Sequence, residues 1–159
     1  METKSFTQRG SLIIWIFIPI ILINCIRFYY HYELGNTDLS PDGILMVVLS
    51  IVLLLMYKIT IKVSESFISL SMGIGIVRKT YSLKDIKSIT PVTNSLLTGW
   101  GIRYIPGGWL YNVSGSKAVE IRFHNSSKVI RIGTDKPEEV CEVINNNLKQ
   151  DRKSTRLNS

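Results

Sequence analysis

Apolar residues form two long runs in the first part of the chain. The first run occupies residues 11–30 (SLIIWIFIPIILINCIRFYY), with Pro19 near its middle, and the second occupies residues 43–61, where Ser50 is the one polar side chain before Lys58. Twenty helical residues rise about 30 Å, the thickness of the hydrocarbon core of a bilayer. We therefore predict two transmembrane helices, the first kinked at its proline and the second leading into a strand near residue 59.

A cleaved signal peptide is the alternative interpretation of the first run, because Lys4 and Arg9 precede it. The run is long, it is flanked by aromatic residues, and no small-residue cleavage site follows it. A second apolar run also comes after it. These features favour a membrane helix.

The charges around the two runs predict their orientation. Glu33, Asp38 and Asp42 lie between the runs, whereas basic residues lie outside them, at Lys4, Arg9, Lys58, Lys62, Arg78 and Lys79. Basic flanks stay on the cytoplasmic side of a membrane. We therefore expect residues 1–61 to anchor the chain in a membrane with both termini in the cytoplasm.

From residue 59 onward, apolar and polar positions alternate with a period of two, which is typical of strands. The alternating runs are residues 59–63, 68–72, 74–81, 86–92, 102–105, 109–113, 117–123 and 128–132, with a turn at residues 124–127. Many short strands separated by turn residues predict a sandwich or a small barrel.

The last segment changes its period again. Asp135 with Glu138 three residues later forms the pattern of a capping box, and Val140, Ile144 and Leu148 recur every four residues. One amphipathic helix is expected here, with Pro137 in its first turn. Residues 59–149 are thus predicted to form one cytoplasmic, mainly-β domain that a C-terminal helix closes.

Three glycine-containing strings carry a resemblance to a known family. They are residues 99–103 (GWGIR), 108–115 (GWLYNVSG) and 131–137 (RIGTDKP). In order and spacing, over most of residues 11–149, the chain resembles the bacterial pleckstrin-homology-like (PH-like) domains of small two-span membrane proteins. The resemblance implies a PH-like barrel behind a membrane hairpin. Members of that family are largely uncharacterised, so it implies no reaction and no ligand.

The composition excludes a disordered chain, and setting aside the last nine residues changes the net charge. The 159 residues are 45% hydrophobic and 19% charged, with a mean hydropathy of +0.18, which excludes a disordered chain. Residues 151–159 (DRKSTRLNS) resemble a translated short-read sequencing adapter, and we expect an assembly artefact there, with a genuine basic tail as the alternative. Without its one acidic and three basic residues, the formal net charge of +7 becomes +5.

Little in the sequence predicts catalysis. Cys25 lies in the first apolar run and Cys141 in the last helix, without the spacing of a metal site or a redox pair. Gly73 and Gly75 fit a tight hairpin better than a phosphate loop. We expect no enzyme, no cofactor and no metal.

Residues 99–115 form the most informative stretch, because glycine and tryptophan are concentrated there. One interpretation is a twisted hairpin whose aromatic side chains cover the core and whose asparagine completes a turn. The other is a surface for a ligand or a partner, with tryptophan walls and an arginine that binds an anion or a carboxylate. The candidate residues are Trp100, Arg103, Trp109, Tyr111 and Asn112.

The charge of the predicted domain suggests what it contacts. Residues 58–149 contain 13 basic and seven acidic side chains, which favours nonspecific contact with anionic lipids of the inner leaflet. A specific inositide site and a nucleic-acid partner are both disfavoured. We therefore expect a membrane-anchored module that recruits or senses a protein partner of unknown identity. The alternative is a structural accessory subunit of a larger membrane complex.

Overall fold

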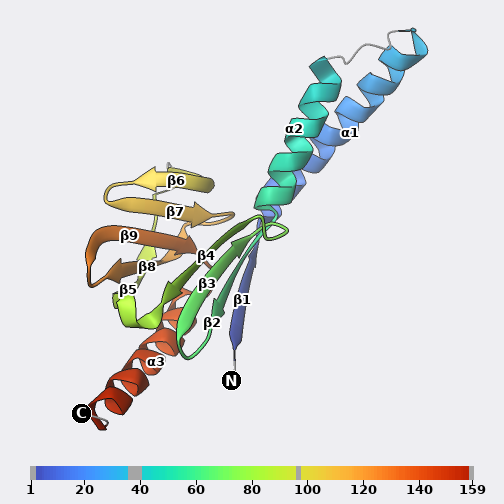
Figure 1. Cartoon of the computed structure of the whole chain (residues 1–159). Coiled ribbons are helices and arrows are strands. Elements are labelled where there is room, and N and C mark those ends of the chain that lie inside the picture. The colour runs from blue at the N-terminus through green and yellow to red at the C-terminus, as the bar shows by residue number, and fades with distance from the viewer. Residues whose placement is uncertain (1–2, 36–40, 96–97, 158–159) are drawn as a thin grey trace.

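A computed structural model describes residues 3–35, 41–95 and 98–157, and their side chains except those of Asp42 and residues 150–157 (Figure 1). A first strand precedes two helices, and the other strands and a final helix follow. The elements are β1 (Lys4–Arg9), α1 (Ser11–Glu33), α2 (Pro41–Met56), β2 (Lys58–Val63), β3 (Phe67–Met72), β4 (Val77–Ser82), η1 (Leu83–Asp85), β5 (Ile86–Thr93), β6 (Gly101–Ile105), β7 (Gly108–Asn112), β8 (Lys117–Phe123), β9 (Ser126–Gly133) and α3 (Pro137–Leu157).

The two N-terminal helices pack against each other and project away from the rest of the molecule (Figure 1). Helix α1 has 23 residues, and its most apolar window of 18 residues has a mean hydropathy of 2.2; among the described residues it is the one helix long and apolar enough to cross a membrane. Helix α2 has 16 residues and spans about 24 Å, less than the predicted second span. It ends at Met56 because the alternating pattern of β2 begins at Lys58, so the prediction of residues 43–61 was too long.

Strand β1 was not expected from the sequence. It pairs antiparallel with β2, from Lys4 opposite Val63 to Arg9 opposite Lys58. The Gly10 N–H donates to the carbonyl of Tyr57 at 2.8 Å, which closes the ladder where the helices begin. The helical hairpin is therefore an insertion between two paired strands.

The strands form two sheets. The first has the order β1-β2-β3-β4 and is antiparallel, and the second has the order β5-β8-β9-β7-β6 with one parallel pair, β7 with β9. The predicted runs 59–63, 68–72 and 117–123 all lie within strands. Within the described part of the chain the strands form two separate sheets that do not close into one barrel, so the predicted PH-like barrel is not confirmed.

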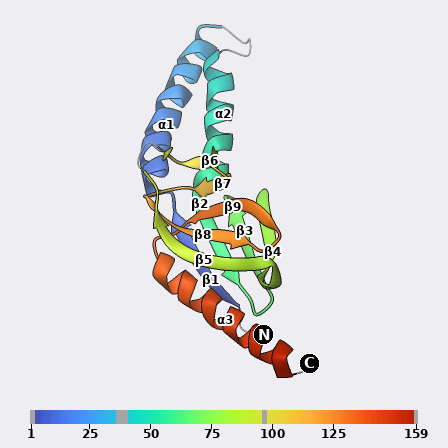
Figure 2. The ribbon, with the colours of Figure 1, turned by 90° about the vertical axis from the view of Figure 1, so that its left-hand side faces the viewer.

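The core lies between the sheets and α3. The inward positions of the sheets, such as Ile61, Leu70 and Ile132, are at most 1% exposed, and Val140 and Ile144 of α3 complete the same cluster. Figure 2 places α3 at the end of the domain away from the helical hairpin. The period of four that predicted this helix thus also predicted its buried face.

The predicted start of α3 needs one correction. The helix begins at Pro137, and the carboxylate of Asp135 accepts a hydrogen bond from the Nε2 of Gln8 at 2.7 Å. Asp135 therefore links the segment before α3 to β1, and it lies one residue before Lys136, the N-cap position of a helix that starts at Pro137. The helix continues through residues 151–157, whose side chains lie outside the description, so the adapter hypothesis stays a prediction.

Candidate functional site

The predicted glycine and tryptophan stretch folds into the hairpin of β6 and β7. Tyr104 pairs with Trp109, and Gly107 has a φ of +83°, a conformation that suits glycine in the tight turn between the strands. Gly108 lies so close to the backbone of Val129 of β9 that a Cβ there would clash with the Val129 carbonyl oxygen. Strand β6 is the edge strand of the second sheet, so one of its sides has no neighbouring strand.

Exposed apolar side chains lie together on one face of this hairpin. Ile102, Tyr104 and Trp109 are 44%, 73% and 45% exposed, and they share a face because Tyr104 is opposite Trp109 and two residues from Ile102. The rings of Tyr104 and Trp109 meet edge to face, with centroids 5.7 Å apart. We call these three residues the β6–β7 patch. Of its members, Trp109 alone was among the site residues predicted from the sequence, although alternation along β6 points to the other two.

Two of the predicted site residues lie inside the domain. Tyr111 is 5% exposed and belongs to the core cluster, and burial raises the pKa of its hydroxyl above the ordinary value. Asn112 is 1% exposed; its side-chain amide donates to the carbonyl of Gly115 at 2.9 Å, and its Oδ1 accepts from the N–H of Ser114 at 3.3 Å. Both residues hold the structure together, which corrects their place in the candidate surface.

Arg103 and Trp100 lie next to the patch in the sequence, but Arg103 alternates with Ile102 and Tyr104 along β6, so its side chain points to the opposite face of the hairpin. The Nε of Arg103 donates to the carbonyl of Trp100 at 3.1 Å, and this bond fixes the start of the exposed arginine side chain. Gly99 has a φ of +68° and passes close to the guanidinium. Trp100 is half-buried. The structure therefore joins Arg103 to Trp100, leaves Trp109 on the other face of the hairpin, and removes Tyr111 and Asn112 from the exposed set.

The hairpin lies at the end of the domain from which the helices emerge. A Cβ on Gly101 would lie 3.5 Å from the Cε of Met56, the last residue of α2. Figure 2 shows β6 and β7 just below the helical hairpin. Near the same end, the β3–β4 turn carries Ile74 and Ile76, which are 57% and 67% exposed. The start of β6 and the β3–β4 turn thus both lie beside the end of α2.

A buried ion-pair cluster lies on the second sheet. Glu120 is 5% exposed; its carboxylate accepts from the Nε of Arg131 and of Arg122, each at 2.8 Å, and Arg131 also donates to the Oδ1 of Asn94. Burial alone would raise the pKa of Glu120, but its bonds to the two arginines outweigh burial and hold this pKa below the ordinary value. The cluster ties β8, β9 and the end of β5 together.

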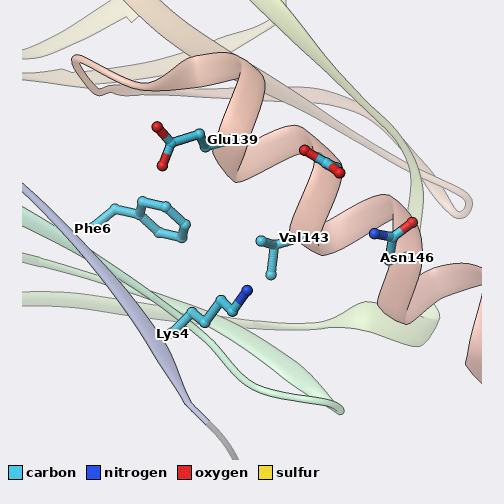
Figure 3. A pocket seen from close by; sticks show the side chains of 6 residues that line it. Lys4, Phe6, Glu139, Val143 and Asn146 are labelled. Atoms are coloured by element: carbon cyan, nitrogen blue, oxygen red, sulfur yellow. The ribbon is translucent and has the colours of Figure 1, made fainter.

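A small pocket near charged groups lies between β1 and α3 (Figure 3). Lys4 and Phe6 of β1 face Glu139 and Val143 of α3 across it. Its volume of about 230 Å³ is below the 300 to 1,000 Å³ of typical ligand pockets. Glu139 is also paired with Lys136 at 2.8 Å. We assign no ligand to this pocket.

The described residues include no group of three or more His, Cys, Asp or Glu side chains placed to hold a metal ion. Cys141 is buried on α3, and burial raises the pKa of its thiol to about 11, which disfavours the reactive thiolate at neutral pH. No protein-family model, curated protein or solved structure matches the chain. The resemblance to PH-like domains therefore stays a prediction.

Proposed function

We propose that the chain is a membrane-anchored module whose helical hairpin holds the β-domain at the cytoplasmic surface. There the edge strand β6 contacts a protein partner, with the β6–β7 patch on one face and Arg103 on the other. The observation that carries the proposal is the pairing of β1 with β2. This pairing puts both ends of the hairpin on one side of any membrane that the hairpin enters.

The exposure of α1 supports the anchoring. Only 11% of its most apolar window is buried within the chain, and Trp15 is 77% exposed, whereas the core helix of a soluble domain would be covered. A cleaved signal peptide would fit poorly, because its removal would take β1 out of the first sheet. The basic residues Arg9 and Lys58 at the base favour the cytoplasm as the side of the domain.

The β6–β7 patch supports the recruiting role. Aromatic residues and arginine are enriched where interfaces gain most of their binding energy. The edge of β6 also offers backbone groups to which an extended segment of a partner can add. Because β6 is anchored by β7 and by the bond from Arg103 to Trp100, this surface is held in place before a partner arrives.

The alternative function, an accessory subunit that packs its helices into a larger complex, has less support. Polar residues in apolar helices can join the helices of different chains, and Asn24 of α1 and Ser50 of α2 are such residues. Each bonds within its own helix, Asn24 to the carbonyl of Ile20 and Ser50 to that of Met46, both at 2.8 Å. We retain the PH-like relationship as part of the proposal, supported by the single C-terminal helix packed against β5 and β8.

Thiol labelling in intact cells tests the anchoring and its orientation. In a chain with Cys25→Ser and Cys141→Ala, a cysteine at Leu34 should react with an impermeant reagent added outside the cells. A cysteine at Asn125, in the β8–β9 turn, should react only after lysis. Equal labelling of both positions, or the reverse pattern, contradicts the proposal.

Photo-crosslinking in membranes tests the recruiting surface. A photoreactive phenylalanine at Tyr104 should give an adduct with one defined protein, and the same group at the exposed Lys87 on β5 should not. Adducts with lipid alone at Tyr104 would show that the patch contacts the bilayer instead, and would contradict the recruiting role.

A further inference from the structure

The outer face of the first sheet contains a shallow hollow of about 450 Å³. Three basic side chains line it, Lys58, Lys62 and Arg78, together with hydroxyl-bearing residues of β1, β2 and β3. No carboxylate is among the residues that line it. A concave surface with several cations and hydroxyl donors has the chemistry of an anion site.

The strand register brings these groups together. Thr7 is opposite Thr60, Thr60 is opposite Ser71, and Ser71 is opposite Arg78, so one row of polar side chains crosses all four strands. Lys58 lies in the row nearer the helices and Lys62 in the row farther from them. The Oγ1 atoms of Thr7 and Thr60 are 3.1 Å apart.

The basic groups of the hollow have no carboxylate partner in the part of the chain that the structure describes. The ion pairs found there join Glu120 to Arg122 and Arg131, and Glu139 to Lys136. The Nζ of Lys58 lies over the ring of Tyr57, 5.2 Å from its centroid, which leaves its charge without a neutralising partner. The hollow therefore carries uncompensated positive charge.

Helix length places this charge at the depth of lipid headgroups. Helix α2 spans about 24 Å against about 30 Å of hydrocarbon, so its end and the first residues of β2 are drawn toward the bilayer. Two strand residues advance about 7 Å, comparable with the 5 to 7 Å of one headgroup layer. Lys58 and the row containing Arg78 thus fall within or next to that layer, beside the exposed Ile74.

We propose that this hollow binds the phosphate of an anionic phospholipid headgroup, with Lys58, Lys62 and Arg78 neutralising the charge and the hydroxyls of Thr60 and Ser71 donating to its oxygens. The proposal rests on the proposed function for the anchoring only; it does not require a protein partner. A lipid is preferred to a free phosphate because the hollow adjoins the end of α2 and an apolar turn that a soluble anion would not need.

Native mass spectrometry of the full chain in detergent micelles tests the site. The chain should bind phosphatidylglycerol at least tenfold more tightly than phosphatidylcholine. Because each basic residue near an anionic surface changes affinity by about fivefold, Lys58→Gln with Lys62→Gln and Arg78→Gln should remove this preference. The matched control, with Lys84, Lys87 and Lys128 changed to Gln, loses the same charge on exposed positions elsewhere and should keep it.

Three results would overturn the site: equal binding of the two lipids, equal loss in the matched control, or displacement of phosphatidylglycerol by inorganic phosphate at the same concentration. Circular dichroism checks the fold of each variant. If the triple variant does not fold, Arg78→Gln alone should weaken the binding of phosphatidylglycerol by about fivefold. An unchanged affinity in this variant would overturn the proposal. If the lipid preference is absent but thiol labelling gives the expected pattern, only the lipid site is refuted. If thiol labelling gives the opposite pattern, the anchoring itself is refuted.

Discussion

The helical hairpin and the β-domain use the same apolar side chains in opposite ways. Ile16 of α1 and Ile51 of α2 are 48% and 50% exposed, whereas Ile61 and Ile132 of the sheets are 1% and 0% exposed. In the domain, other parts of the chain cover the isoleucines. In the hairpin, most of that surface is left for another apolar medium to cover.

Polar side chains differ between the two regions in the same way. In the hairpin, Asn24 and Ser50 bond to carbonyls four residues earlier in their own helices. In the domain, Gln8 of β1 bonds to Asp135, 127 residues away, and to the carbonyl of Ser114. The hairpin thus satisfies its polar groups locally, as a bilayer requires, whereas the domain depends on contacts between distant segments.

The largest effect should come from truncating an isoleucine in each region. Ile132→Ala leaves a cavity in the closed core and should lower the free energy of unfolding of the β-domain by about 2 to 5 kcal/mol. Ile16→Ala should leave this free energy within about 0.5 kcal/mol. Urea unfolding of the full chain in detergent measures both.

Equal effects of the two substitutions would remove the distinction between the regions. A large effect of Ile16→Ala on the domain would mean that the hairpin contributes to its core. Ile89→Ala, at a buried position of β5, is a second core variant if Ile132→Ala does not fold.

A smaller effect is expected at the junction of the two regions. Gln8→Ala removes two hydrogen bonds and leaves Asp135 and the carbonyl of Ser114 without their donor. A lost buried partner costs about 1 to 3 kcal/mol, and hydrogen exchange should become faster in β1. Thr7→Ala, whose hydroxyl lies on the exposed face, is the control and should stay within about 0.5 kcal/mol. Unchanged exchange in β1 would show that Gln8 does not hold the strand.

Periodicity predicted much of this fold, because burial by near neighbours leaves a local pattern. The alternation at residues 117–123 and the period of four in Val140, Ile144 and Leu148 are of this kind, and both match buried faces. Strand β1 left no such signal, since Phe6 is its one large apolar residue. Its partner β2 lies beyond two helices, so the pairing joins segments that are distant in the sequence and leaves no local pattern.

The candidate site was predicted in outline for a related reason. The glycines and tryptophans located the hairpin of β6 and β7, but composition does not tell which face of a strand is covered. Trp109 and Tyr111 lie on the same face of β7 between the same two strands, yet Tyr111 belongs to the core cluster and is 5% exposed, whereas Trp109 is 45% exposed. The Glu120 cluster was not found because its members come from three separate strand regions.

The Glu120 cluster should give the domain a stability term that depends on pH. The folded pKa of Glu120 lies below its unfolded value of about 4.3, so the contribution is present above that value and is lost as pH falls through the folded pKa. Between pH 5 and pH 3, Glu120→Gln should therefore lose less stability than the unchanged chain. Glu142→Gln, at an exposed position, should keep the original slope in urea unfolding. Parallel curves for all three chains would contradict the ionised cluster.

The smallest effect on stability, and the one that bears most on function, is expected at Arg103. Its side chain is exposed and makes one bond, to the carbonyl of Trp100, so Arg103→Ala should change the free energy of unfolding by no more than about 0.5 kcal/mol. If the β6–β7 patch recruits a partner, the yield of the protein adduct from position 104 should still fall about tenfold or more, because an interface arginine of this kind contributes about 2 kcal/mol.

Trp109→Ala should lower that yield as well, but at a measurable cost in stability, since more than half of its surface is covered. Arg122→Ala is an unsuitable control, because it disturbs Glu120; Lys87→Ala changes one exposed charge on β5 and should alter neither quantity. An Arg103→Ala chain that folds normally and gives the full adduct would remove Arg103 from the site and leave the exposed aromatic pair as its remaining basis.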